Sequence, residues 1–321
     1  MMSGEAVKVL SGEGEAGDGE AVSSSEPGGA PTFNGALTAL VTPFRDGEVD
    51  QQALWELVEF QIQSGVDGLV PCGTTGESAT LTHSEHGQVI KIVVQQARRR
   101  VPVVAGTGSN STAEAIRRTA SAREAGADGA LLISPYYNKP TQDGIFRHYK
   151  MIAAAVDLPL IVYNIPGRTS STIAPETFAR LSEIRNIVAI KEASGFMDQT
   201  SDIRRLCGDR LTILSGDDSL TLPLMALGAK GVVATVSNVM PRETHELAAA
   251  ALAGDYARAR DLHYKLLPLV RALLAETSPI PVKQALAFMG KCRAEMRMPL
   301  TQMSPGPAEK LHAVMKELRL I

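Results

Sequence analysis

A lysine interrupts one of the most apolar stretches of the sequence. In "NIVAIKEASG" (186–195), Lys191 follows an apolar run that predicts a buried strand. Burying an ammonium group costs several kcal/mol unless the group is paired or neutralised. Strand alternation places the neighbouring carboxylate of Glu192 on the opposite face, which argues against a structural ion pair. A desolvated amine has a lowered pKa and attacks carbonyl carbon, so we interpret Lys191 as a lysine that forms a Schiff base.

Polar residues also follow other predicted strands, in "CGTTGES" (72–78), "SPYYNKP" (134–140), "YNIPGRT" (163–169) and "SGDD" (215–218). Schiff-base chemistry needs proton transfers, and the phenol of Tyr163 could relay protons if a hydroxyl such as Thr75 or Tyr137 orients it. Any one of these tyrosines could instead be a half-buried packing residue. The occurrence of three hydroxyl residues in three such segments favours a shared site.

Two features suggest sites for carboxylates. The glycines of "GTTGES" allow backbone N–H groups to approach an anion, and Thr74 and Thr75 add hydroxyl donors. Arg168 could hold a second carboxylate with two parallel hydrogen bonds. The alternative for "GTTGES" is a plain strand-to-helix loop, and the alternative for Arg168 is a solvated surface charge.

Metal and nucleotide sites are poorly supported. His83 and His86 in "HSEH" lack the HExxH spacing, and no third ligand is evident, so we expect no metal. The glycines of "AGTGSN" (105–110) are too few to indicate a nucleotide. We expect no cofactor, because the lysine supplies the electron sink itself.

Composition excludes several classes of partner. The net charge is −3 and the pI is near 6.1, so no basic field suggests a nucleic acid or an anionic membrane surface. No apolar run approaches the roughly 18 to 20 residues that cross a bilayer. The 3 cysteines form no CxxC pair, which fits a reducing compartment. We expect a cytoplasmic protein that acts on small molecules.

From residue 36 onward, short β-rich runs alternate with longer helical patterns. Eight strands are predicted, at 36–41, 67–72, 101–106, 129–134, 159–164, 187–192, 211–216 and 231–236. Helical patterns lie between them, as at 51–63, 112–125 and 219–228, and two more follow at 255–276 and 308–320. A weak repeat, "SGVDGLV", "AGADGAL" and "LGAKGVV", marks three helix-to-strand junctions.

Eight apolar strands with intervening helices predict a parallel (β/α)₈ TIM barrel. An open doubly wound sheet is the alternative, but no GxGxxG follows the first strand. We expect a disordered acidic tail at 1–33, the barrel at 34–250 and a C-terminal helical region at 251–321.

From about Phe33 onward, the chain resembles the pyruvate-dependent class I aldolase family, and within it the dihydrodipicolinate synthases. The resemblance rests on "GTTGES", "SPYYNKP", "YNIPGRT", "IKEASG" and "SGDD" in this order and spacing. It implies that the enzyme condenses pyruvate with aspartate semialdehyde to give 4-hydroxy-tetrahydrodipicolinate, a precursor of diaminopimelate and lysine.

The resemblance also assigns roles to residues. Lys191 would form the imine, and Tyr163 would relay protons with Thr75 and with Tyr137 from a neighbouring subunit of a homotetramer. The pyruvate end would be held by Thr74 and by backbone around Gly216 and Val233, and Arg168 would bind the carboxylate of the aldehyde substrate.

Lysine-inhibited members suggest a further site at a subunit interface. The matching residues are Ser78, Ala79, His83, His86, Asn110, Glu114 and Tyr136. Here Glu114 could pair with the ammonium group of the inhibitor. The alternative is that these residues are ordinary polar residues of loops.

Two other functions stay open at the level of sequence. N-acetylneuraminate lyases and sugar-acid lyases use the same scaffold and lysine for other aldehydes, although their residue at the Arg168 position usually differs. A catalytically silent barrel that acts as a binding protein is the third possibility. The intact set of Lys191, Tyr163 and Thr75 argues against it.

Overall fold

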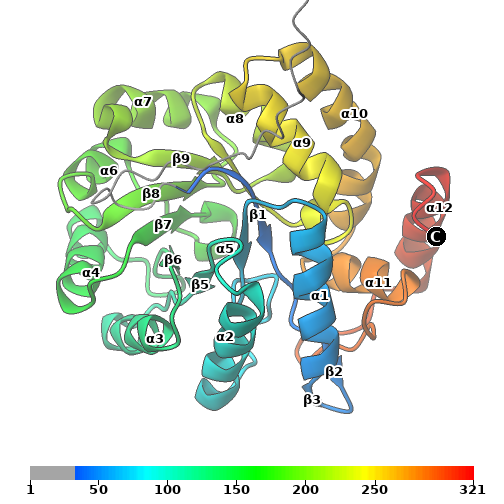
Figure 1. The fold of residues 1–321 in the computed structure, drawn as a ribbon. Helices are drawn as coiled ribbons and strands as arrows, with labels where there is room; N and C mark the ends of the chain where they lie inside the picture. The colour runs from blue at the N-terminus through cyan, green and yellow to red at the C-terminus, as the bar shows by residue number, and fades with distance from the viewer. Residues whose placement is uncertain (1–32) are drawn as a thin grey trace, which may run out of the picture.

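Eight strands form one parallel sheet that closes into a barrel (Figure 1). The computed structural model describes residues 33–321, so the predicted tail falls, except for Phe33, outside the described residues. The strands are β1 (Gly35–Ala39), β4 (Gly68–Val70), β5 (Val104–Gly106), β6 (Gly129–Ile133), β7 (Leu160–Asn164), β8 (Ile187–Glu192), β9 (Thr212–Ser215) and β10 (Gly231–Ala234). Their order is β4-β1-β10-β9-β8-β7-β6-β5, and a parallel bridge from Leu69 to Val103 joins the two edges. The barrel prediction is confirmed, and the open-sheet alternative is wrong.

Helices surround the barrel on its outside (Figure 1). They are α1 (Gln51–Gln63), α2 (His83–Ala97), α3 (Thr112–Glu124), α4 (Gln142–Ala155), α6 (Pro175–Leu181), α7 (Met197–Cys207), α8 (Thr221–Ala226) and α9 (Pro241–Leu252). A four-residue helix, α5 (Pro166–Thr169), lies instead in the loop that follows β7. Short 3₁₀ turns are η1 (Gly208–Arg210), η2 (Asp218–Leu220) and η3 (Val236–Asn238). The predicted helix at 219–228 is therefore a 3₁₀ turn followed by a shorter helix.

The repeated glycines form the junctions that the sequence predicts. The first glycine of each repeat, Gly65, Gly126 or Gly228, has φ between 88° and 99°, in the left-handed region where a side chain is strained. The second glycine begins the next strand. At Gly231 a Cβ would lie 2.0 Å from the carbonyl oxygen of Gly35, so only glycine fits between β10 and β1.

Side-chain caps fix the starts of several helices. Asp50, Ser111 and Thr141 each accept a hydrogen bond from the backbone of the following turn. Thr82 and Glu85 form a reciprocal capping box at the start of α2. This box also marks the end of the long loop that follows β4. That loop carries Thr74 and Thr75.

Two apolar layers make up the core. Inward-facing side chains fill the barrel, among them Leu37, Val70, Leu131 and Leu214. A larger layer lies between the sheet and the helices, with Leu54 and Ile90 as examples. The interior is therefore packed, and the chemistry is confined to the end of the barrel where the strands finish.

The chain continues into α10 (Tyr256–Leu273), α11 (Ile280–Phe288) and α12 (Pro305–Glu317). Figure 1 shows α11 and α12, in orange and red, outside the ring beside α10 and α1. The predicted boundary at residue 250 falls within α9, and α10 packs against α9, so the division into two regions stays a prediction. The sequence analysis missed a small antiparallel hairpin formed by β2 (Phe44–Arg45) and β3 (Glu48–Val49).

Candidate active site

A cavity of about 640 Å³ opens at the carboxyl ends of the strands. Its walls include residues from the loops after β4, β7, β8 and β9, as well as residues that follow α10. Of the eight residues predicted for catalysis and substrate binding, the structure brings together six in this cavity, namely Thr74, Thr75, Tyr163, Arg168, Lys191 and Gly216. The convergence that the barrel predicts is therefore present within one chain.

Lys191 projects from β8 into this cavity with only 7% of its surface exposed. Its neighbour in the sheet register is Tyr163 on β7, and the Lys191 Nζ lies 4.3 Å from the centroid of the Tyr163 ring. Burial lowers the pKa of Lys191 to about 8, although Asp218 opposes the shift. A substantial fraction of this amine is therefore neutral near physiological pH, as a nucleophile requires.

Glu192 is engaged away from Lys191. Its carboxylate accepts hydrogen bonds from Asn164 Nδ2 at 3.0 Å and from the Ser194 N–H at 2.6 Å. No ion pair involves Lys191 anywhere in residues 33–321. The structural alternative for this lysine, a pair with Glu192, is thus wrong.

Tyr163 and Thr75 are both buried at the cavity. Burial raises the pKa of the Tyr163 phenol, so the hydroxyl stays protonated at neutral pH and can donate. Two hydroxyl groups beside one amine are suited to passing protons to and from a reacting molecule.

Gly216 lies against the lysine side chain. A Cβ at this position would come within 3.0 Å of both Cγ and Cε of Lys191. Any larger residue would displace the lysine, so the glycine makes room for it. Val233 is buried inside the barrel and does not line the cavity, so it can act only through its backbone or by packing.

Arg168 stands at the mouth of the cavity on the short helix α5. Its Nη2 donates to Thr277 Oγ1 at 3.4 Å and to the Ser278 carbonyl at 3.3 Å. Both partners belong to the segment between α10 and α11. The C-terminal region therefore helps to place the cation that the sequence predicts for a carboxylate.

Asp218 is a residue to which the sequence analysis assigned no role. Its carboxylate accepts hydrogen bonds from the backbone N–H groups of Thr235 at 3.1 Å and Val236 at 2.8 Å. Burial raises the pKa of Asp218 to about 6, so the group is largely ionised at neutral pH. The signal was the pair of acids in "SGDD", directly after a predicted strand.

Tyr137 lies apart from the other predicted residues. It is 89% exposed and does not line the cavity, whereas its neighbour Tyr136 does. Its backbone adopts a φ of 73°, which is uncommon for a residue with a side chain. Within one chain Tyr137 does not join Lys191, and its contribution from a second subunit stays a prediction.

Three of the seven residues of the predicted lysine site line the cavity, and the other four do not. Ser78, Ala79 and Tyr136 line the cavity wall. His86 is buried, its Nε2 lies 2.9 Å from the Gly106 carbonyl oxygen, and burial lowers its pKa to about 4. The Asn110 carbonyl accepts a hydrogen bond from the Asn138 side chain at 3.0 Å.

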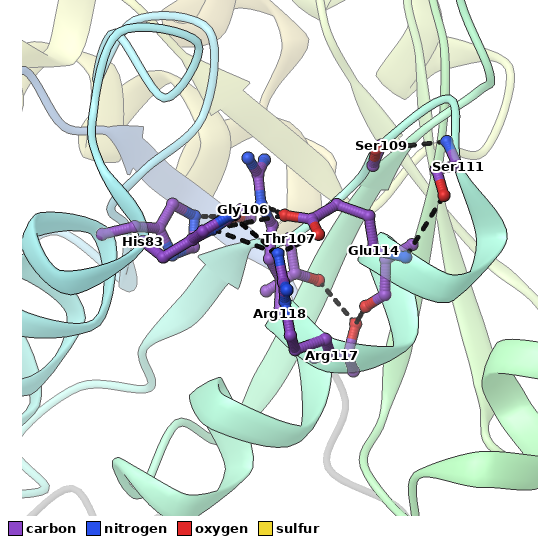
Figure 2. A network of polar contacts seen from close by, with 11 residues as sticks. His83, Gly106, Thr107, Ser109, Ser111, Glu114, Arg117 and Arg118 are labelled. Atoms are coloured by element: carbon purple, nitrogen blue, oxygen red, sulfur yellow. Dashed lines mark hydrogen bonds and ion pairs between the residues drawn. The ribbon is translucent and has the colours of Figure 1, made fainter.

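Glu114 stands at the centre of a charged network (Figure 2). Its carboxylate pairs with Arg118 at 2.8 Å, with Arg117, and with His83 at 3.3 Å. Both arginines come from the same helix, α3, and His83 comes from α2. The carboxylate that was predicted to meet the ammonium group of an inhibitor is therefore already neutralised by two guanidinium groups.

The part of the chain that the structure describes contains no group of three or more His, Cys, Asp or Glu residues suited to a metal ion. Within that same range, no helix is both long and apolar enough to span a bilayer.

A buried, unpaired lysine in a hydroxyl-lined cavity at the carboxyl end of a (β/α)₈ barrel defines the class I aldolase type of enzyme. The profile described as the Dihydrodipicolinate synthetase family matches residues 32–318. The chain belongs to this family, as the sequence motifs indicated.

Individual relatives agree with this assignment. A 4-hydroxy-tetrahydrodipicolinate synthase of Geobacter sulfurreducens is 57% identical over 289 residues, which cover 90% of this chain and 100% of the relative. The crystal structure of a dihydrodipicolinate synthase from Aquifex aeolicus is 53% identical, with a TM-score of 0.88, and the match covers 90% of this chain and 99% of that one. The enzyme from Cyanidioschyzon merolae, solved with lysine bound, is 40% identical, with a TM-score of 0.87, over 90% of this chain and 99% of that one.

Proposed function

We propose that this enzyme condenses pyruvate with L-aspartate 4-semialdehyde to give 4-hydroxy-tetrahydrodipicolinate. The observation that carries the proposal is the amine of Lys191, which is buried beside Tyr163 and has no carboxylate partner among the described residues. The relatives that act as 4-hydroxy-tetrahydrodipicolinate synthases support the choice of reaction. The product feeds the synthesis of diaminopimelate and lysine.

In the first half of the reaction, neutral Lys191 Nζ adds to the keto carbon of pyruvate, and loss of water leaves an imine. The protonated imine nitrogen draws electrons from C3, which loses a proton to give an enamine. Tyr163 and Thr75 are suited to carry the protons in these steps, because both hydroxyls line the cavity with the amine. The covalent imine makes a separate cofactor unnecessary.

In the second half, the enamine carbon attacks the aldehyde carbon of aspartate semialdehyde, and the new alkoxide takes up a proton. The amino group of the substrate then adds to the imine carbon, which closes the ring and releases Lys191. Arg168 at the mouth is suited to bind the carboxylate of this second substrate. Thr74 and the backbone at Gly216 are suited to hold the carboxylate of pyruvate, because both residues line the cavity.

The assembly and the compartment are also proposals. A homotetramer built from two dimers would bring Tyr137, which is exposed in the single chain, to the active site of a neighbour. The three cysteines are unpaired in the structure, which supports the reducing cytoplasm as the working compartment.

Turnover with each class of aldehyde tests the reaction. The purified enzyme should consume pyruvate and aspartate semialdehyde together, and should leave N-acetylmannosamine and sugar-derived aldehydes untouched. Cleavage or formation of a sugar acid would assign the chain to the sugar-acid lyases instead. Turnover with neither class would favour the catalytically silent barrel that acts as a binding protein.

We also propose that L-lysine inhibits the enzyme at the residues around Glu114, as the lysine complex of the Cyanidioschyzon merolae relative suggests. The ammonium group of lysine would have to compete with Arg117 and Arg118 for the Glu114 carboxylate. Replacing the exposed Arg117 by alanine should therefore tighten inhibition several-fold in a steady-state assay. Undiminished turnover of the unmodified enzyme at saturating lysine would contradict the proposal.

A further inference from the structure

A buried carboxylate lies in the loop that carries Thr74 and Thr75. Glu77 follows Thr75 by two residues, its side chain is fully buried, and its backbone has a φ of 53°. A residue with a side chain adopts this left-handed conformation at a cost of about 1 kcal/mol, so something must hold it there. The Thr42 hydroxyl, which donates to the Gly76 carbonyl at 2.7 Å, fixes one side of the turn.

The other side is fixed by the C-terminal region. Lys283 of α11 is fully buried, and its Nζ donates to Glu77 Oε1 at 2.6 Å and to the Glu295 carbonyl at 2.7 Å. The same Nζ lies 4.1 Å from the centroid of the Phe44 ring. The Arg297 N–H donates to the second Glu77 oxygen at 3.2 Å, so both carboxylate oxygens are bound from the C-terminal segment.

Arg297 binds the same loop further along. Its guanidinium group donates to the Thr80 carbonyl at 3.1 Å and pairs with Glu85, the capping residue of α2. Glu77 and Thr80 are also joined directly, since the Thr80 N–H donates to the Glu77 carbonyl at 3.0 Å. Lys283 and Arg297 thus bind the loop at two places, first at Glu77 and then at Thr80 and Glu85. Both places follow Thr74 and Thr75 in the chain.

Backbone hydrogen bonds connect Glu77 to the two threonines. The Glu77 N–H donates to the Thr74 carbonyl at 3.1 Å, and the Gly76 N–H donates to the Gly73 carbonyl at 3.1 Å. Glu77 therefore belongs to the same tight turn as Thr74 and Thr75. A displacement of its carboxylate would move the two threonines, which line the same cavity as Lys191.

We propose that Glu77 and Lys283 are positioning residues for the reaction, which hold the Thr74–Thr75 turn in register with Lys191. The inference rests on the function proposed above. A buried ion pair is often no more stable than apolar residues of the same volume, so its presence here is better explained by placement than by stability. A misplacement of about 1 Å at a reacting group can cost about a hundredfold in rate.

The test uses the double substitution E77L/K283M, which removes both charges and keeps the volume. Two rates are measured at saturating pyruvate, the exchange of the pyruvate methyl hydrogens in D₂O by NMR and the turnover with aspartate semialdehyde. Both rates are divided by the amount of imine trapped with borohydride, so that only folded, imine-forming chains are counted. The matched control is R185M, which removes the exposed ion pair with Asp157.

We expect the double variant to form the imine and to lose at least about tenfold in both rates, because the proton relay is misplaced. R185M should match the unmodified enzyme. The single variant E77Q, which keeps the shape of the side chain, should show a smaller loss in the same two rates. E77Q leaves the buried Lys283 ammonium without its carboxylate but keeps the volume of the side chain and an acceptor oxygen. Measured per trapped imine, it provides a second comparison if the double variant folds poorly.

Rates per imine in E77L/K283M or E77Q that equal those of the unmodified enzyme would overturn the inference, since the pair would then serve stability alone. Failure of the proposed function has a different signature. In that case the unmodified enzyme itself would trap no pyruvate or would not turn over aspartate semialdehyde.

Discussion

Two lysines are buried in the described part of the chain, residues 33–321, and their surroundings differ. Lys191 lies inside the barrel mouth, is 7% exposed, and has no carboxylate in contact. Lys283 lies between the barrel and the C-terminal helices, is 0% exposed, and donates to the Glu77 carboxylate at 2.6 Å. Burial lowers the pKa of both amines, and a carboxylate opposes each shift. At Lys191 this is Asp218, which forms no ion pair with it, whereas at Lys283 it is the hydrogen-bonded Glu77.

The difference teaches that burial alone does not make a lysine a nucleophile. A carboxylate at hydrogen-bond distance favours the charged form of the amine and occupies its protons. An amine that faces a cavity without such a partner is free to lose its proton and to react. The same residue type therefore serves as reactant in one place and as anchor in the other.

The largest expected effect comes from removing the reactive amine. Lys191→Met should lower turnover by more than about 10⁴-fold, because the covalent route disappears. A coupled assay for pyruvate consumption measures the loss, and circular dichroism checks that the barrel is intact. Substantial remaining turnover would mean that the reaction does not pass through Lys191.

Stability should respond to the two lysines in opposite directions. Lys283→Met leaves Glu77 buried without its partner and should cost about 3–5 kcal/mol at pH 7 in urea unfolding. Lys191→Met removes a group whose pKa falls from 10.5 to about 8 on folding. Its charged form is disfavoured in the folded state, so this variant should gain stability of order 3 kcal/mol at pH 7.

The sign of the Lys191 effect fixes its pH dependence. The cost of burying the charged amine is fully present below pH 8, fades as pH rises from 8 to 10.5, and is absent above 10.5. The advantage of Lys191→Met should shrink over that same range. An advantage that did not change with pH would show that packing, rather than charge, separates the variant from the unmodified enzyme.

A smaller effect is expected at the mouth. Arg168→Lys keeps the positive charge but loses the planar fork that binds a carboxylate, and should lower kcat/KM for aspartate semialdehyde by about 10- to 100-fold. Imine formation with pyruvate alone should hardly change. An equal loss in both measurements would place Arg168 at the pyruvate end instead.

The smallest effect tests the second subunit. Tyr137→Phe should lower turnover by about tenfold while trapping of pyruvate persists, because only a proton relay is interrupted. The turnover of the variant is compared with that of the unmodified enzyme at protein concentrations above and below the one at which the subunits dissociate. Analytical ultracentrifugation measures that concentration. If the variant were fully active in the assembled state, Tyr137 would have no part in the relay.

The role of Lys191 could be predicted from the sequence and that of Lys283 could not, for a physical reason. A charge inside an apolar strand is conspicuous, because strand alternation leaves it few partners. A charge in "IPVKQALAF" resembles an ordinary polar position on a helix, and its partner Glu77 is 206 residues away in the chain. Pairings of this kind depend on how distant segments pack, so the contact between the C-terminal region and the Thr74–Thr75 loop could not be predicted.

The barrel itself was predictable because each strand and each helix-to-strand junction leaves a local pattern. The run at 187–192 matches β8 at both ends, and Gly65, Gly126 and Gly228 have a left-handed backbone at the three predicted helix-to-strand junctions. The engagement of Glu114 by Arg117 and Arg118 was missed, although both arginines follow it at helical spacing. Arginines three and four residues after a helical glutamate are the local pattern that indicates such pairs.

Reductive trapping with peptide mapping separates the two lysines most directly. The enzyme is incubated with pyruvate and borohydride, digested, and analysed by mass spectrometry for a lysine that carries the reduced adduct. We expect the adduct on Lys191 alone, with a yield that rises as pH approaches 8, and an unmodified Lys283. An adduct at another lysine, or none at all, would contradict the assignment of Lys191 as the nucleophile.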